Sequence, residues 1–213
     1  MYRNFFKRFL DLTLTFAALM VAFPVFLVII ILLWFANKGK PFFFQERPGK
    51  NEKIFRVVKF KTMNDKKDEK GELLPPARRI TAAGRFLRTT SLDEIPQLWN
   101  VLRGDMSLVG PRPLLIDYLD FFREDEKKRH WVRPGITGLA QISGRNNLPW
   151  SERLMLDVKY VENISFTLDL KILFKTVKNV LLRKDIAVIP GLIFQPLNVE
   201  RSNENNLQAN TRK

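Results

Sequence analysis

The sequence predicts a mixed α/β chain (α+β) with an N-terminal re-entrant membrane helix, a small β-hairpin and a cytoplasmic domain with interfacial amphipathic helices. Three observations predict it: an apolar run near the N-terminus, two β-patterned segments around a Pro-Gly turn, and later segments with helical periodicity. We expect three regions, namely a membrane hairpin at 1–38, a catalytic domain at 39–190 and a flexible tail at 191–213.

The apolar run at 12–35 has 24 residues, no charge and a single proline, Pro24. One helix of this length could cross a hydrocarbon core of about 30 Å, so a single transmembrane anchor is one interpretation. Pro24, however, ends or kinks a helix, and each arm is about one leaflet deep. Basic residues flank both ends of the run, and positive charge prefers the cytoplasmic side. We therefore predict a helix–break–helix that enters and leaves by one face.

The composition limits the chemistry that this chain can perform. The net charge of +14 suits nucleic acid, an anionic bilayer or phosphorylated substrates. The absence of cysteine excludes disulfides and thiolate nucleophiles, and the single histidine, His130, excludes multi-histidine zinc sites. Any catalyst here would use carboxylates, hydroxyls, cations and a hard metal ion.

The remaining segments are assigned by pattern. Residues 41–47 and 53–63 predict two strands joined by a turn at 48–51. Residues 1–11 and 168–184 predict basic amphipathic helices on a membrane surface, although the second would also suit a core-facing helix. Helices are further expected at 114–131 and 150–163, with His130 structural or a helix-end cation, and disorder is expected from 198.

Adjacent carboxylates, Asp93 and Glu94, open a segment whose apolar residues recur at helical spacing up to Gly104. That spacing predicts a buried stripe of Ile95, Leu98, Trp99 and Leu102. The helix could begin with a capping box from Ser91 to Glu94, or with Asp93 as the cap and Pro96 in the first turn. Two carboxylates at a helix N-terminus near Arg85 and Arg88 would suit Mg²⁺ and a phosphorylated ligand, while ordinary capping is the alternative.

Other candidate residues follow along the chain. Arg112 stands between two prolines, a stiff frame for an arginine that binds phosphate, or a simple loop–helix junction. Arg145 ends a glycine-rich segment that would allow close approach of a ligand. Asp157 lies one turn from Arg153, and a surface ion pair is the plain interpretation of that spacing.

Several motifs in fixed order carry a family resemblance. They are FFFQERPG at 42–49, KFKTM at 59–63, SLDEIPQLWNVLRGDMSLVGPRP at 91–113 and RPGITGLAQISGRN at 133–146. With the proline-broken apolar run, the chain resembles the bacterial sugar transferase family, the small membrane-embedded polyprenyl-phosphate phosphoglycosyl transferases, from about residue 2 to 185. Within that family it is most similar to the diacetylbacillosamine-1-phosphate transferases. It departs from the pattern at Phe23, where members often carry serine.

The resemblance implies transfer of a phosphosugar from a UDP-sugar to undecaprenyl phosphate with release of UMP, an early membrane step of glycoconjugate or protein-glycosylation assembly. It implies an active site at the cytoplasmic face of a bacterial inner membrane, and Mg²⁺ at a catalytic pair that maps onto Asp93 and Glu94. Asp93 would form an aspartyl–phosphosugar intermediate. Arg88, Arg112 and Arg145, with Lys59 assisting, would neutralise the diphosphate, and Asp157 matches an acidic family position with a pairing or orienting role.

Two other classes of protein stay open at this point. A membrane-anchored nucleic-acid-binding protein would explain the charge, but no reading helix or stacking platform is recognisable, so we expect no nucleic acid partner. A non-catalytic scaffold at the bilayer would explain the amphipathic segments. The sequence identifies neither the sugar nor the oligomeric state, and a homodimer is left open.

Overall fold

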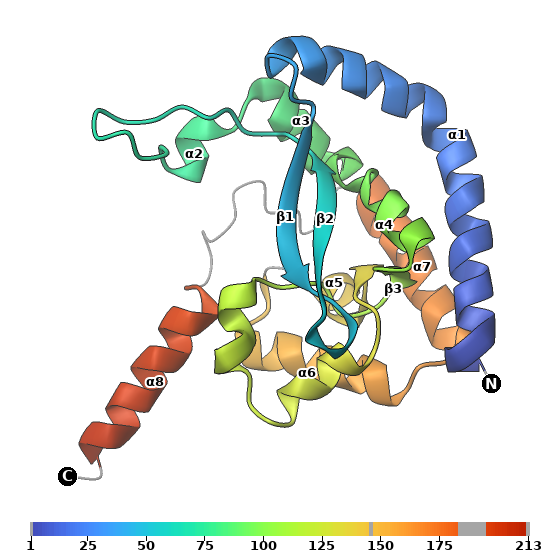
Figure 1. The fold of residues 1–213 in the computed structure, drawn as a ribbon. Coiled ribbons are helices and arrows are strands. Elements are labelled where there is room, and N and C mark those ends of the chain that lie inside the picture. The colour runs from blue at the N-terminus through green and yellow to red at the C-terminus, as the bar shows by residue number, and fades with distance from the viewer. Residues whose placement is uncertain (1, 145–146, 183–194, 212–213) are drawn as a thin grey trace.

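A computed structural model describes residues 2–144, 147–182 and 195–211 of the chain (Figure 1). The α-helices are α1 (Lys7–Ala36), α2 (Pro76–Arg79), α3 (Ala82–Thr89), α4 (Gln97–Arg103), α5 (Leu139–Ser143), α6 (Trp150–Glu162), α7 (Phe166–Leu181) and α8 (Leu197–Thr211). The strands are β1 (Phe42–Pro48), β2 (Ile54–Phe60), β3 (Ser107–Val109) and β4 (Gly135–Thr137). A π-helical turn, Tyr2–Phe6, precedes α1. The predicted mixture of helices with a small antiparallel sheet is confirmed.

Helix α1 contains the whole apolar run and is long and apolar enough to cross a membrane. The predicted division into two helices is wrong, because α1 continues through Pro24 without a break. Figure 1 shows instead that the helix bends midway, so that one limb runs beside α4 and α7 and the other passes over α3. A proline removes one hydrogen bond and clashes with the preceding turn, which accounts for a bend within a continuous helix.

Both limbs of α1 contact the same domain. In the N-terminal limb, Arg8 donates to the carbonyl oxygen of Val101 at 2.6 Å, and Asp11 accepts from the Ser107 hydroxyl at 2.7 Å. In the C-terminal limb, Ile29 and Leu33 are buried in a cluster with Phe60 and Leu87. Just past the helix end, the Asn37 amide donates to the carbonyl oxygen of Lys61 at 2.9 Å.

The predicted β-hairpin is confirmed, with β1 and β2 antiparallel and Phe42 opposite Phe60. Helix α3 begins beside the end of this hairpin, where a Cβ on Gly84 would lie 1.9 Å from the carbonyl oxygen of Thr62. Only glycine allows that approach. Because the backbone comes so close, Arg88 at the end of α3 reaches Thr62 and donates to its hydroxyl at 2.9 Å.

The core lies between the short parallel pair β3–β4 and helices α5 to α7. Its buried members are Val109, Val132, Ile142, Tyr160, Val161 and Ile172. A second buried cluster joins α6 to the segment after Arg112 and to α8, with Leu154 and Leu197 both 0% exposed.

Two predicted elements differ from the structure. The single helix expected at 114–131 is two 3₁₀ segments, Ile116–Phe121 and Glu126–Trp131. The chain turns between them, and the Glu126 carboxylate accepts a hydrogen bond from the Arg123 amide at 2.8 Å. The disorder expected from 198 is also wrong, because α8 is helical and its Arg201 forms a buried ion pair with Glu126 at 2.7 Å. The boundaries of the three regions stay predictions.

Helix α7 exposes much of its apolar stripe. Phe174, Val177 and Leu181 are all exposed, whereas Ile172 on another face is fully buried. One side of α7 therefore faces the core, as the core-facing alternative predicts, because Leu168 and Leu173 pack with Ile172. Most of the predicted stripe is exposed, and a surface-binding role stays a prediction.

Candidate active site

The acidic pair lies in a 3₁₀ turn, Leu92–Glu94, which links α3 to α4. Neither predicted cap is present: Ser91 has a left-handed backbone with φ 57° and makes no capping bond, and α4 begins at Gln97 with Pro96 as its N-cap. The left-handed residue turns the chain before the helix starts, so the two carboxylates precede α4 by about one turn. The predicted stripe is correct only in part. Trp99 is 58% exposed, whereas Ile95, Leu98 and Leu102 are half-buried. The fully buried residues of α4 are Gln97, Asn100 and Val101.

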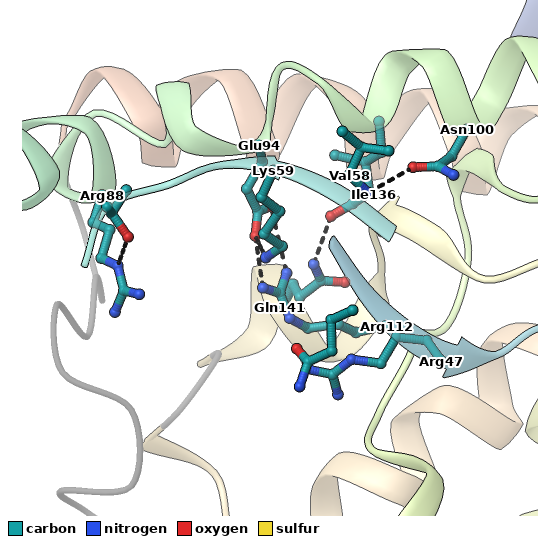
Figure 2. A network of polar contacts seen from close by, with 11 residues as sticks. Arg47, Val58, Lys59, Arg88, Glu94, Asn100, Arg112, Ile136 and Gln141 are labelled. Carbon is teal, nitrogen blue, oxygen red and sulfur yellow. Dashed lines mark hydrogen bonds and ion pairs between the residues drawn. The ribbon is translucent and has the colours of Figure 1, made fainter. Parts of the chain in front are cut away.

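Glu94 is held between two cations from different parts of the chain (Figure 2). Lys59 of β2 donates to Glu94 Oε1 at 2.7 Å, and Arg112 donates to the same oxygen at 2.6 Å. A second Arg112 nitrogen lies 3.5 Å from Oε2, so the guanidinium faces the carboxylate as a fork. The structure thus brings together three residues separated in sequence by up to 53 positions.

The electrostatics of the two adjacent carboxylates are opposite. The Arg112 and Lys59 charges and their hydrogen bonds outweigh burial and hold the pKa of Glu94 well below its usual range. Burial, reinforced by the Glu94 charge, raises the pKa of Asp93 to about 6 although Lys59, Arg88 and Arg112 oppose the rise. Burial also lowers the pKa of Lys59 and of Arg88, against the attraction of the same carboxylates. Glu94 therefore stays ionised, whereas the pKa of Asp93 lies at about 6.

Asp93 accepts no hydrogen bond from the part of the chain that the structure describes. A desolvated carboxylate without hydrogen-bond donors is more basic and more nucleophilic than one held by cations. The pair therefore combines a carboxylate held by two cations with one that no described residue holds by a hydrogen bond, a division that the sequence spacing alone could not reveal.

Asp157 lies behind this site and not in it. It is 3% exposed and forms an ion pair with the buried Arg129 at 2.9 Å, so the predicted surface pair with Arg153 is wrong. Arg129 also donates to the backbone carbonyl of Arg112 at 2.6 Å. Asp157 and Arg129 thus fix the backbone that presents Arg112. His130, beside them, has its pKa lowered to about 3 by burial and by Arg129, which makes it a neutral structural residue and not a helix-end cation.

A pocket of ≈ 100 Å³ adjoins the acidic pair. Its polar lining comes from Gln45, Arg47, Lys59, Gln97 and Arg112, and its apolar lining from Phe43, Val57, Pro113 and Leu114. No sequence pattern marks Arg47 or Gln97 as a candidate site residue. Arg47 was visible only as part of the FFFQERPG motif, and Gln97 as one polar residue in a stretch expected to be helical.

The other predicted site residues are distributed as follows. Arg88 lies at the end of α3 and its charge acts on Asp93. Arg145 lies outside the described residues. Lys59 and Arg112 contact Glu94 directly. Asp157 is not one of the described residues that line the pocket.

The acidic pair can be tested as a magnesium site by its donor set. Mg²⁺ typically takes one or two protein carboxylates and completes its shell with substrate phosphates and water. Among the residues that the structure describes, Asp93 accepts no hydrogen bond, and Glu94 Oε2 has only the long 3.5 Å contact with Arg112. No group of three or more acidic or histidine side chains in the described ranges is arranged to hold a metal. The pair thus fits an ion that is shared with a substrate.

Fold and site together define a class of protein, a membrane-associated enzyme with an acidic pair set among cations. Within this class the chain belongs to the bacterial sugar transferase family, whose model matches residues 2–183.

Similar proteins occur in several bacteria. The chain is 50% identical over 180 residues to the uncharacterized sugar transferase EpsL of Bacillus subtilis, covering 84% of this chain and 89% of that protein. It is 41% identical over 202 residues to the undecaprenyl-phosphate galactose phosphotransferase of Salmonella typhimurium, covering 85% of this chain but 41% of that protein. It is 40% identical over 182 residues to the UDP-glucose:undecaprenyl-phosphate glucose-1-phosphate transferase of Klebsiella pneumoniae. That match covers 81% of this chain and 39% of that protein. The chain therefore spans about two fifths of the length of the last two proteins.

Proposed function

We propose that this protein transfers a sugar phosphate from a UDP-sugar to undecaprenyl phosphate and releases UMP. The observation that carries the proposal is the unequal acidic pair. Glu94 is neutralised by Lys59 and Arg112, which also line a cationic pocket, whereas Asp93 accepts no hydrogen bond from the described residues. Relatives named for undecaprenyl-phosphate galactose and glucose-1-phosphate transfer support the reaction class.

The reaction is proposed to proceed in two displacements. An Asp93 carboxylate oxygen attacks the phosphorus that bears the sugar, and the bond from that phosphorus to the bridging oxygen breaks. The bridging oxygen keeps the electron pair and leaves with UMP. The phosphate oxygen of undecaprenyl phosphate then attacks the same phosphorus, and Asp93 is released as a carboxylate. A covalent intermediate of this kind predicts ping-pong kinetics.

The surrounding residues act by charge and by position. Lys59 and Arg112 fix Glu94 and offset the negative charge of the diphosphate. Asp157 and Arg129 act on Arg112 through its backbone and are positioning residues. Mg²⁺ held by Asp93 and Glu94 would neutralise further charge on the diphosphate.

The membrane arrangement belongs to the same proposal. A donor dissolved in water and a lipid acceptor can meet only at an interface, and α1 with the apolar stripe of α7 offers apolar surface there. We propose that α1 is re-entrant from the cytoplasmic face of the bacterial inner membrane. The support is that Arg8 near one end and Asn37 just past the other both bond to the same domain.

This proposal does not specify which sugar the UDP donor carries. Diacetylbacillosamine follows from the motif resemblance, whereas the named relatives carry galactose or glucose. A panel of UDP-sugars offered to the purified full chain with undecaprenyl phosphate would identify the donor by UMP release.

Asp93→Asn tests the covalent route. We expect UMP release to fall by at least about 10³-fold, and wild-type protein to carry the labelled phosphosugar on the peptide with residue 93. Asp120→Asn, which changes an exposed carboxylate, is the matched control and should keep full activity. Near-normal turnover in Asp93→Asn would remove the covalent route. A wild-type protein that releases no UMP from any UDP-sugar would favour the scaffold or nucleic-acid-binding alternative.

A further inference from the structure

The pocket beside the acidic pair contains two guanidinium groups close to each other. Figure 2 shows the Arg47 and Arg112 side chains lying side by side, one from β1 and one from the segment after β3. Arg112 is neutralised by Glu94. Arg47 has no carboxylate partner in the described part of the chain and donates to Gln45 Oε1 at 2.6 Å. Burial and the Arg112 charge lower the pKa of Arg47 to about 10, although the Asp117 charge opposes the change.

Gln97 supplies a second, independent observation. It is 2% exposed and lines the same pocket, yet its Nε2 has no hydrogen-bond partner among the described residues. A buried donor without an acceptor is costly, and native proteins rarely keep one unless a ligand or water satisfies it. Two guanidinium groups and an unsatisfied amide donor line the same pocket of ≈ 100 Å³, and this set of donors suits an anion rich in hydrogen-bond acceptors.

We infer that Arg47 and Gln97, together with Arg112, bind the phosphate of the leaving nucleoside monophosphate. The inference rests on the proposed function and assigns this pocket to one part of its donor. When the bond between the sugar-bearing phosphorus and the bridging oxygen breaks, negative charge develops on that oxygen. The two guanidiniums and the amide N–H would stabilise this charge, because preorganised donors act most strongly where charge appears in the transition state.

The position of the pocket favours this phosphate over the sugar-bearing one. Arg112 contacts Glu94 and also lines the pocket, so it lies between the acidic pair and Arg47. A phosphorus under attack by Asp93 would therefore be flanked by the next phosphate of the same donor on the Arg47 side. The phosphate of undecaprenyl phosphate has the same chemistry and is the alternative occupant, which separate half-reactions distinguish.

Arg47→Gln tests the inference on the full chain in lipid nanodiscs. Adduct formation is measured with labelled UDP-sugar alone, and discharge is measured after removal of free donor and addition of undecaprenyl phosphate. We expect adduct formation to slow by about 10²-fold and the direct binding of UMP to weaken, with discharge close to wild type. Arg56→Gln, which removes an exposed arginine from β2, is the matched control and should behave as wild type in every assay.

The Gln97→Met variant distinguishes a loss of UMP binding from a general loss of stability. It removes the unsatisfied donor at similar size, so the thermal midpoint should stay the same or rise while UMP binding weakens. A residue that merely supports the fold would lower both together. Arg47→Lys should retain more UMP binding than Arg47→Gln, because lysine keeps the positive charge but lacks the paired N–H donors of a guanidinium.

Three results would overturn the inference. Unchanged adduct formation and UMP binding in both Arg47→Gln and Gln97→Met would remove the pocket from the reaction. A defect confined to discharge would assign the pocket to the lipid phosphate. Failure of wild-type protein to bind UMP or inorganic phosphate in equilibrium dialysis would exclude an anion pocket, whether or not any donor is turned over. UMP binding without turnover of any UDP-sugar would instead leave the pocket standing and remove the proposed function.

Discussion

The guanidinium of Arg112 donates a hydrogen bond of 2.6 Å to the Glu94 carboxylate, and this contact helps to shift the pKa values of two carboxylates that are neighbours in sequence in opposite directions. With Glu94 neutralised by Arg112 and Lys59, the adjacent Asp93 is left as the carboxylate with the raised pKa. Two titratable groups whose environments push their pKa values apart are a common arrangement in active sites.

The first prediction concerns pH. In the proposed route Asp93 attacks only when it is ionised. Burial and the Glu94 charge raise its pKa to about 6, so the rate of adduct formation should fall as the pH drops through about 6. Glu94→Gln removes the like charge beside Asp93 and leaves Lys59 and Arg112 uncompensated. Both effects lower the pKa of Asp93, so the acid limb of the pH profile should move to lower pH. If the acid limb of the pH–rate profile of Glu94→Gln stayed in place or moved to higher pH, this electrostatic account would be contradicted.

The second prediction concerns stability. The pKa of Asp93 is higher in the folded chain than in the unfolded chain, so an ionised Asp93 destabilises the fold above about pH 6. This destabilisation is relieved as the pH falls through the folded value. Asp93→Asn should therefore raise the thermal midpoint at pH 7.5 by about 2–4 °C, equivalent to about 1 kcal/mol after allowance for solvent screening. The gain should shrink below pH 6, and exposed Asp120→Asn should show none.

The sequence predicted much of this arrangement, for identifiable reasons. Strand periodicity and a Pro-Gly turn are local signals, so the β1–β2 hairpin was predicted correctly. The start of α4 was predicted wrongly because the left-handed Ser91 is not visible in composition. Asp157 looked like a surface residue until the fold brought Arg129 against it. Helical spacing likewise identified a stripe in α4 but not which face the domain would bury.

The third prediction concerns the buried pair behind Arg112. Arg129 and Asp157 have side chains 1% and 4% exposed, so removing one partner leaves an unpaired buried charge. Asp157→Asn should cost about 3–5 kcal/mol of unfolding free energy, and the double variant Arg129→Met/Asp157→Leu should cost less than the sum of its single changes. Lys128→Ala breaks the exposed pair with Glu162 and should cost under about 1 kcal/mol. Additive single effects in chemical denaturation would show that the pair is not coupled.

The fourth prediction concerns α8, which the sequence suggested would be disordered. Leu197 is 0% exposed and packs in the cluster of Trp150 and Leu154. Leu197→Ala should therefore destabilise the protein by about 2–5 kcal/mol, as truncation of a buried leucine does. Val199→Ala, two residues on and 41% exposed, should change stability by no more than about 0.5 kcal/mol. Equal midpoints for the two variants in thermal unfolding would mean that α8 is not docked.

The fifth prediction concerns the direction of α1 in the bilayer. The chain has no cysteine, so single cysteines can be introduced at Arg3 and at Lys38 without background labelling. Arg8 bonds to α4 and Asn37 bonds next to β2, and both belong to the domain that carries the acidic pair. A spanning helix would have to break one of these sets of contacts. We therefore expect a membrane-impermeant maleimide to label both cysteines from the cytoplasmic side only, and both to stay unlabelled in intact cells.

Substitution of Pro24 tests whether the bend in α1 keeps both ends of the helix on the same side of the membrane. In the Pro24→Ala variant the helix regains the missing hydrogen bond and straightens, which carries one limb away from the domain. The contacts of Arg8 and Asn37 would then compete with a straight helix, and we expect part of the Arg3→Cys population to become labelled from outside the cell. Val25→Ala, an exposed position one residue on, controls for loss of side-chain volume. Outside labelling of Arg3→Cys with Pro24 intact would establish a spanning helix and remove the re-entrant arrangement.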